Sequence, residues 1–375
     1  MGSASLYQLA KRGVDVIGVD RFSPPHQFGS THGDTRVTRR AIGEGTSYVP
    51  LVTRSHELWR EIEAESGDEL LTQCGGIIFG PSANDTVQHG VSDFLQSTID
   101  AANLYGIRHE LFDEQQMREK FPQFNLKGGE SGYFEYDAGY VRPEASVAAQ
   151  IRLAESQGAQ VFRDTPINKI ERIGNSFRLE SDGDIFETGQ LVLSAGSWVG
   201  DLIGSRLSGL FSVYRQVLYW FEPTTQRDLF SNTALPIFIW VTEDSDEMLY
   251  GFPETSPGSG VKVGTEQYIE KTHPDTRKLE VTDDEKERMS EFVRVRMPWL
   301  AGPCVKAVSC LYTCTPDFAF VIDQHPEWDN CQIVSACSGH GFKHSAAIGE
   351  VVAQRITSGA SEIDVSDFSF GNLGK

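Results

Sequence analysis

Six cysteine residues are the first candidates for covalent or metal chemistry, and they lie at positions 74, 304, 310, 314, 331 and 337. No two of them have CxxC spacing, and no group of His and Cys has the spacing of zinc ligands. An intracellular chain of 375 residues can bury a large core without disulfides. The open question is whether one cysteine acts alone as a thiolate, since a buried free cysteine is usually a small apolar residue.

Lys343 is a second candidate, because it lies in the first turn of a helix predicted over residues 342–358. A cation there opposes the helix dipole at a cost of roughly a few tenths of a kcal/mol, which suggests a ligand nearby. The backbone N–H groups of the same helix terminus can face an anion.

Asp20 ends a short apolar run, residues 14–19, which follows a helix predicted over residues 3–12 and a turn at Gly13. Helix, tight turn, strand and terminal acid form the second half of a βαβ dinucleotide unit, where the acid accepts hydrogen bonds from a ribose hydroxyl. A full fingerprint has an apolar strand and two glycines before this helix, and Gly2 can supply only the third glycine. A generic α/β start with a surface Asp is the alternative.

The elements that must position these side chains are of two kinds. An apolar run at 190–194 predicts a buried parallel strand that stops at Gly196, where open α/β sheets bind ligands; a plain tight turn is the alternative. Long β-rich runs over residues 213–262 predict a separate, mainly antiparallel layer. The chain returns to α/β character with a strand at 332–336 and a turn at 339–341. Further helices are predicted over residues 53–64, 91–104, 145–157 and 283–297.

Composition excludes several classes of function. The net charge of −20, from 33 basic and 53 acidic residues, argues against a nucleic-acid partner, because phosphate binding needs a basic surface. No window approaches 18 consecutive apolar residues, so we expect no membrane span. The termini carry no signal peptide or targeting signal, so we expect a cytoplasmic protein.

Several segments together resemble the family of monomeric sarcosine oxidase and N-methyltryptophan oxidase, FAD-dependent amine oxidoreductases of the D-amino acid oxidase fold superfamily. They occur in the family's order over essentially the whole chain and read HGDTRVTR (32–39), GEG (43–45), YVPL (48–51), YRQV (214–217), YGFP (250–253), CLYT (310–313) and SGHGFK (338–343). The resemblance implies a monomer, FAD, and oxidation of a secondary amine with O2 as acceptor.

The same resemblance implies an α/β fold with two domains. A discontinuous, Rossmann-like FAD-binding domain would comprise residues 1–74, 140–206 and 314–375. A mainly antiparallel substrate domain would comprise residues 75–139 and 207–313.

Roles follow from the resemblance position by position. Cys310 matches the cysteine that holds the flavin through a thioether, and a thiolate is soft and nucleophilic enough for that link. Lys262 matches the lysine that promotes the reaction of reduced flavin with oxygen, because a fixed cation stabilises developing superoxide charge. A lysine in an alternating strand is otherwise a solvent-facing residue.

Four further residues match the substrate site. Arg39 and Lys343 match the pair that binds the substrate carboxylate, to which arginine offers a planar fork and lysine a point charge. Tyr250 and Tyr312 match tyrosines that flank the substrate. The alternatives are a surface ion pair for Arg39 and core aromatic packing for the two tyrosines. The positions implied for FAD are Gly2, Asp20, His32, Arg36, Ile167, Gly196, Cys310, Gly339, Gly341, Phe342 and Lys343.

The chain departs from the family at two places. Sarcosine oxidase has an active-site histidine four residues after the oxygen-activating lysine, where this chain has Glu266, so its amine substrate can differ from sarcosine. The first strand and two glycines of the dinucleotide fingerprint are missing. We expect an oxidase of N-methyl amino acids that releases formaldehyde and hydrogen peroxide. The alternatives are an oxidase of cyclic imino acids such as pipecolate or proline, a catalytically impaired flavoprotein or scaffold, and a nicotinamide-dependent dehydrogenase.

Overall fold

The computed structural model describes residues 1–81, 87–89, 91–242 and 248–374. Its α-helices are α1 (Gly2–Lys11), α2 (Val49–Ser66), α3 (Phe94–Leu104), α4 (Glu114–Lys120), α5 (Pro143–Ser156), α6 (Val199–Leu202), α7 (Asp283–Arg296) and α8 (Ser345–Ser358). Within these described ranges, no helix is both long and apolar enough to cross a membrane.

The strands, most of them short, lie before, between and after these helices along the chain. They are β1 (Ile17–Val19), β2 (Arg36–Thr38), β3 (Leu71–Thr72), β4 (Gly76–Pro81), β5 (Val87–Gln88), β6 (Val91–Ser92), β7 (His109–Phe112), β8 (Glu130–Glu135), β9 (Gly139–Val141), β10 (Gln160–Phe162), β11 (Lys169–Ile173), β12 (Ser176–Glu180), β13 (Ile185–Thr188), β14 (Leu191–Leu193), β15 (Ser212–Phe221), β16 (Ile237–Trp240), β17 (Leu249–Phe252), β18 (Val261–Gly264), β19 (Cys304–Cys314), β20 (Val321–Gln324) and β21 (Cys331–Ser335).

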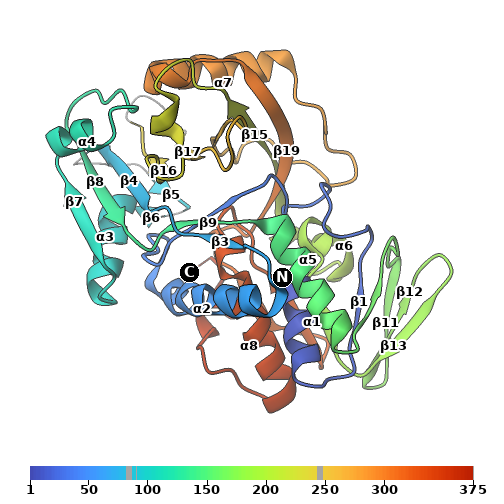
Figure 1. Cartoon of the computed structure of the whole chain (residues 1–375). Coiled ribbons are helices and arrows are strands. Elements are labelled where there is room, and N and C mark those ends of the chain that lie inside the picture. The colour runs from blue at the N-terminus through green and yellow to red at the C-terminus, as the bar shows by residue number, and fades with distance from the viewer. Residues whose placement is uncertain (82–86, 90, 243–247, 375) are drawn as a thin grey trace.

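The predicted antiparallel layer is an eight-stranded sheet with the order β19-β15-β18-β17-β16-β4-β8-β7. All its neighbouring strands are antiparallel except β16 and β4, which are parallel. In Figure 1 helix α7 lies along the top of the molecule near β15 and β19, while β7 and β8 lie toward the opposite edge of the sheet. The prediction of a mainly antiparallel layer is therefore confirmed, and β4, β7, β8 and β19 extend it beyond the expected run.

Parallel strands and helices form the other part of the α/β fold. Strand β1 pairs in parallel with β10, and β14 pairs in parallel with β21, as the apolar run at 190–194 predicted. Helix α1 packs against α5 and α8, and these helices gather with α2 in the lower part of Figure 1. A Cβ on Gly349 of α8 would lie 2.5 Å from the carbonyl carbon of Ala4. Glycine is therefore needed where α1 and α8 cross.

Several predicted helix boundaries differ from the observed ones, and one of these differences has a clear local cause. The helix predicted over residues 91–104 begins only at Phe94, because Val91 and Ser92 form strand β6. Asp93 is the N-cap of α3, and its carboxylate accepts a hydrogen bond from the backbone N–H of Gln96 at 3.3 Å. An aspartate in that position starts a helix more readily than it continues one.

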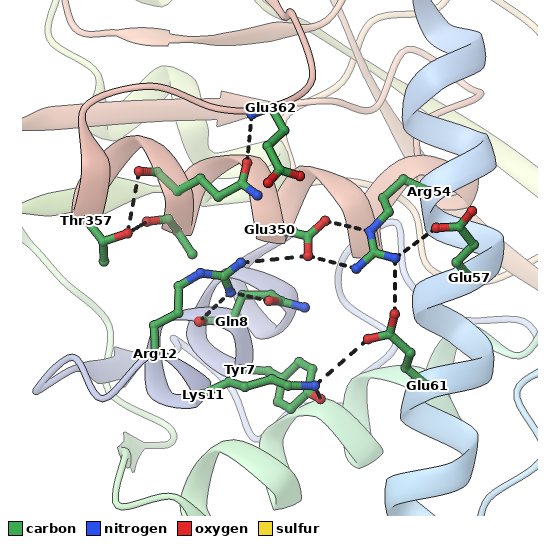
Figure 2. A network of polar contacts seen from close by, with 12 residues as sticks. Tyr7, Gln8, Lys11, Arg12, Arg54, Glu57, Glu61, Glu350, Thr357 and Glu362 are labelled. Carbon is green, nitrogen blue, oxygen red and sulfur yellow. Dashed lines mark hydrogen bonds and ion pairs between the residues drawn. The ribbon is translucent and has the colours of Figure 1, made fainter.

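An ion-pair network joins helices α1, α2 and α8 (Figure 2). Arg54 of α2 donates two hydrogen bonds to Glu350 of α8, from Nε at 2.8 Å and from Nη2 at 3.0 Å. Its Nη1 also donates to Glu57 at 2.8 Å and to Glu61 at 3.0 Å. Arg12 of α1 lies 3.7 Å from Glu350. The bidentate geometry fixes the two helices in one relative orientation.

Candidate active site

Arg39 and Lys343 come from distant parts of the chain and share one carboxylate, that of Glu44. Arg39 follows β2, and its Nη2 donates to Oε2 of Glu44 at 2.6 Å. The Nζ of Lys343 lies 3.9 Å from Oε1 of Glu44 and donates to the carbonyl of His340 at 2.7 Å. All three charged side chains are at most 4% exposed. Arg39 is therefore in a buried ion pair and not in a surface pair.

Burial and charge act in opposite directions on these groups. Burial favours the neutral form of Glu44, but the charges of Arg39 and Lys343 outweigh it and hold the pKa of this carboxyl well below its usual range. Burial lowers the pKa of Lys343 to about 8, even though Glu44 opposes that change. The prediction that Lys343 lies in the first turn of the helix is wrong by one turn, because Phe342–His344 form a 3-10 turn and α8 begins only at Ser345.

A second carboxylate, that of Glu266, lies beside the first and is 10% exposed. The Nε2 atom of His89 is 3.0 Å from Oε2 of Glu266, and Nδ1 of the same imidazole is 3.5 Å from Oε1 of Glu44. Tyr268 donates to Oε2 of Glu266 at 2.9 Å, and Tyr312 donates to its Oε1 at 3.3 Å. Burial lowers the pKa of His89, but the two carboxylates outweigh it and raise this pKa to about 9.

The two predicted tyrosines lie at this carboxylate. Tyr312 is on β19 and Tyr250 on β17, and burial raises the pKa of both hydroxyls. Gly339 closes the site from the turn before α8, with φ of +82°. A Cβ there would lie 2.9 Å from the hydroxyl of Tyr268 and 3.1 Å from the ring of Tyr312. Both the backbone conformation and the lack of space require glycine.

Sequence reasoning missed His89 and Tyr268 as members of the site. His89 precedes the predicted helix at 91–104 and belongs to no recognised motif, so no pattern pointed to it. Tyr268 follows Glu266 by two residues, and that spacing on an extended segment was the available signal. Glu44 lies within the GEG segment, but no role was assigned to it.

Lys262 lies on β18 and is 2% exposed, so it is not a solvent-facing strand residue. Its Nζ donates to the backbone carbonyls of Gly33 and Thr35, each at 2.7 Å. The ring of Phe252 lies 4.5 Å from the same atom. Burial, followed by the charge of Arg36, lowers the pKa of Lys262 well below its usual value.

Cys310 and Arg36 lie beside Lys262. The Nη2 atom of Arg36 is 3.5 Å from Sγ of Cys310 and donates to the carbonyl of Ser30 at 2.6 Å. Burial raises the pKa of the Cys310 thiol, whereas the charge of Arg36 acts to lower it. His32 is buried, and its Nε2 has no hydrogen-bond partner among the described residues. A soft thiol, a cation and an imidazole with an unsatisfied nitrogen fit the edge of a flavin ring.

Two of the other positions expected for FAD, Asp20 and Gly2, lie near the start of the chain. Asp20 accepts a hydrogen bond from the N–H of Phe22 at 2.8 Å. A Cβ on Gly2 would lie 2.9 Å from Oγ of Ser194, so the start of α1 passes close to the end of β14.

Four more positions expected for FAD lie in turns or in apolar packing. Gly196, after β14, has φ of +56°, and a Cβ on it would meet no atom within 4 Å. Gly341 approaches the carbonyl of Ala336 too closely for any Cβ. Ile167 packs against a separate apolar cluster. Phe342 stacks on Trp59. No group of three or more potential metal ligands occurs in the described part of the chain.

The fold and the buried site together define a class of protein. The family described as FAD dependent oxidoreductase (DAO) matches residues 1–355, and the chain belongs to this family. It is therefore an FAD-dependent enzyme with the fold of that family.

Individual relatives narrow the comparison. A monomeric sarcosine oxidase from Bacillus sp. (strain NS-129) is 37% identical over 374 residues, 98% of this chain and 93% of the relative. An N-methyl-L-tryptophan oxidase from Yersinia pestis (strain Pestoides F) is 33% identical over 377 residues, 100% of this chain and 96% of the relative. The predicted family resemblance is thereby confirmed.

Solved structures show the same fold at lower identity. NikD, an unusual amino acid oxidase essential for nikkomycin biosynthesis, superposes with a TM-score of 0.83 at 20% identity, covering 98% of this chain and 94% of that one. An L-proline dehydrogenase from P. horikoshii gives a TM-score of 0.79 at 21% identity, covering 98% and 93%.

Proposed function

We propose that this protein is a monomeric oxidase of N-methyl amino acids that uses FAD and O2. The observation that carries the proposal is the convergence of Arg39 and Lys343 on a single buried carboxylate. Two cations taken out of water are stable only with an anionic partner, and a substrate carboxylate can replace Glu44 in that role. Membership of the family supplies the redox chemistry.

The chain's own residues then have distinct tasks. Arg39 and Lys343 bind the carboxylate and so fix the amine in one orientation, while Tyr250 and Tyr312 flank it and exclude water. Bound FAD would supply the redox chemistry, as the acceptor of the two electrons and the hydrogen that the substrate's N-methyl group loses and as the donor of two electrons to O2. The imine product takes up water and releases formaldehyde and the primary amine, while O2 gains two electrons and two protons and leaves as hydrogen peroxide. Lys262 holds a positive charge where charge develops on oxygen.

The residues near Cys310, Arg36 and Lys262 would hold the cofactor. Cys310 is proposed as the thioether link, with His32 and Arg36 beside the ring and Asp20 at the ribose. Residues 1–74, 140–206 and 314–375 would form the FAD-binding domain, and 75–139 with 207–313 the substrate domain.

Oxygen uptake by the purified FAD-loaded protein tests this function. We expect uptake with sarcosine or a larger N-methyl amino acid, with equal amounts of formaldehyde and hydrogen peroxide. The matched controls are the corresponding amino acids without the N-methyl group, which should give neither product. Uptake with proline or pipecolate and no formaldehyde would assign a cyclic imino acid oxidase instead. Uptake with none of these compounds would contradict the proposal.

A further inference from the structure

Five charged side chains form a line of alternating sign through the site, with two cations at its first position. The positive pair Arg39 and Lys343 contacts Glu44, Glu44 contacts His89, and His89 contacts Glu266. His89 therefore lies between two carboxylates, 3.5 Å from Glu44 and 3.0 Å from Glu266. The function proposed above uses only the first pair of cations, so it gives His89 no task.

When a substrate carboxylate replaces Glu44 at Arg39, Glu44 loses its countercharge. Once a substrate carboxylate takes Arg39 and Lys343, Glu44 loses its two strongest partners but stays in a buried position. A buried carboxylate without a countercharge is strongly destabilised, and this cost would be subtracted from the binding of substrate. Something must hold Glu44 in the substrate-bound state.

We propose that His89 is a positioning residue that holds Glu44 while the substrate carboxylate occupies Arg39 and Lys343. The proposal rests on the function proposed above. His89 is suited to the task because its other ring nitrogen is anchored on Glu266, so that its charge is already compensated in both states of the site.

Among the groups that surround His89, none of the others can be the cationic partner of Glu44. Tyr268 lies 2.9 Å from its Nε2, and the ring of Phe318 packs on it. His340 also reaches Glu44, at 3.9 Å from its Nδ1. Burial and the charge of Lys343 hold the pKa of His340 well below its usual value, despite Glu44, so this imidazole is neutral at pH 7. The pKa of His89 is raised instead, so His89 carries the charge.

A double-mutant cycle on the FAD-loaded protein tests the assignment. The probe is propionate, which has a carboxylate and no amine, and its binding is measured by calorimetry. His89→Gln should weaken propionate binding by at least about tenfold, because Glu44 loses its alternative partner. In a Glu44→Gln background, His89→Gln should change binding by less than about twofold, because the side chain at position 44 then carries no charge that depends on His89. His89→Asn replaces His89→Gln if the latter does not fold.

The outcomes separate this inference from the proposed function. Equal weakening by His89→Gln in both backgrounds, or no weakening in either, overturns the role of His89. Arg39→Gln serves as the reference. If it abolishes propionate binding while His89→Gln does not change it, only the role of His89 is wrong. If Arg39→Gln leaves binding intact, the carboxylate site itself is wrong and the inference falls with it.

Discussion

Nη2 of Arg39 lies 2.6 Å from Oε2 of Glu44, and both side chains are almost completely buried. The cation proposed to bind substrate is therefore already paired with a carboxylate of the protein. An incoming carboxylate must compete with Glu44 for Arg39. Its affinity therefore depends on the difference in free energy between the two ion pairs.

Loss of Arg39 should weaken substrate binding far more than loss of an exposed arginine. Arg39→Gln removes the guanidinium group from a buried ion pair. We expect kcat/KM to fall by an amount that corresponds to a free energy on the order of 2–5 kcal/mol. The control is the methyl ester of the same amino acid, which lacks the charge and should react equally poorly with the wild type and the variant. Equal turnover of acid and ester by the wild type would contradict the assignment.

Substrate affinity should fall as pH rises through the range where Lys343 loses its proton. The pKa of Lys343 is lowered to about 8, and only its protonated form attracts a carboxylate. Because the pKa of Glu44 is held far lower, Glu44 remains ionised throughout and contributes no step in this range. The affinity for propionate, which has no amine to titrate, should therefore be level below pH 8 and decline above it, first with Lys343 and then near pH 9 with His89. In Lys343→Met the step near pH 8 should disappear, and its persistence would assign it to another group.

Lys262 should act on oxygen and not on amine oxidation, and stopped flow times the two half-reactions separately. Lys262→Met should leave anaerobic reduction of the flavin by substrate largely intact. Reoxidation by O2 should slow by roughly two or more decades, since a fixed charge aimed at developing charge contributes about 3–4 kcal/mol. Because burial lowers the pKa of Lys262, wild-type reoxidation should also slow as pH rises, at a pH well below 10.5. Equal slowing of both half-reactions would make Lys262 a structural residue.

Cys310 should carry the flavin covalently. Its Sγ is buried 3.5 Å from a guanidinium nitrogen of Arg36, whose charge favours the thiolate against the effect of burial. Intact-mass measurement should show one added FAD, and Cys310→Ser should abolish the addition. Cys314 and Cys337 are the control positions, and their serine variants should keep the adduct. An adduct that survives Cys310→Ser would place the link elsewhere.

The network around Arg54 should contribute to stability near neutral pH and lose its effect in acid. Arg54→Met should lower the free energy of unfolding by about 1 kcal/mol at pH 7, because it removes a partly buried bidentate pair. The folded-state pKa of Glu350 is depressed below 4.5, so its contribution is present above that value and is lost as pH falls through the folded pKa. Urea unfolding at several pH values measures the difference. Arg206→Met is the control, because the Arg206 side chain is 80% exposed in its pair with Glu327, and it should change stability by less than about 0.5 kcal/mol.

The sequence by itself determined the fold class and the identity of several elements. Helix α7 was predicted from its periodicity, and it begins at a capping box formed by Thr282 and Glu285. The apolar run at 190–194 predicted the parallel strand β14. These features are local, because periodicity, capping and apolar runs act within a few residues of one another. The family resemblance added candidate roles for Cys310, Lys262 and Arg39.

Only the tertiary structure decided how the charged side chains meet. Arg39, His89, Glu266 and Lys343 are far apart in sequence, and no local pattern indicates that they converge on a shared line of ion pairs. The sequence did not predict which charged side chains are buried either. The alternating segment around Lys262 is typical of a solvent-facing lysine, yet this side chain is buried. The energy of a buried charge depends on which groups replace its water, and that is set by packing between distant segments.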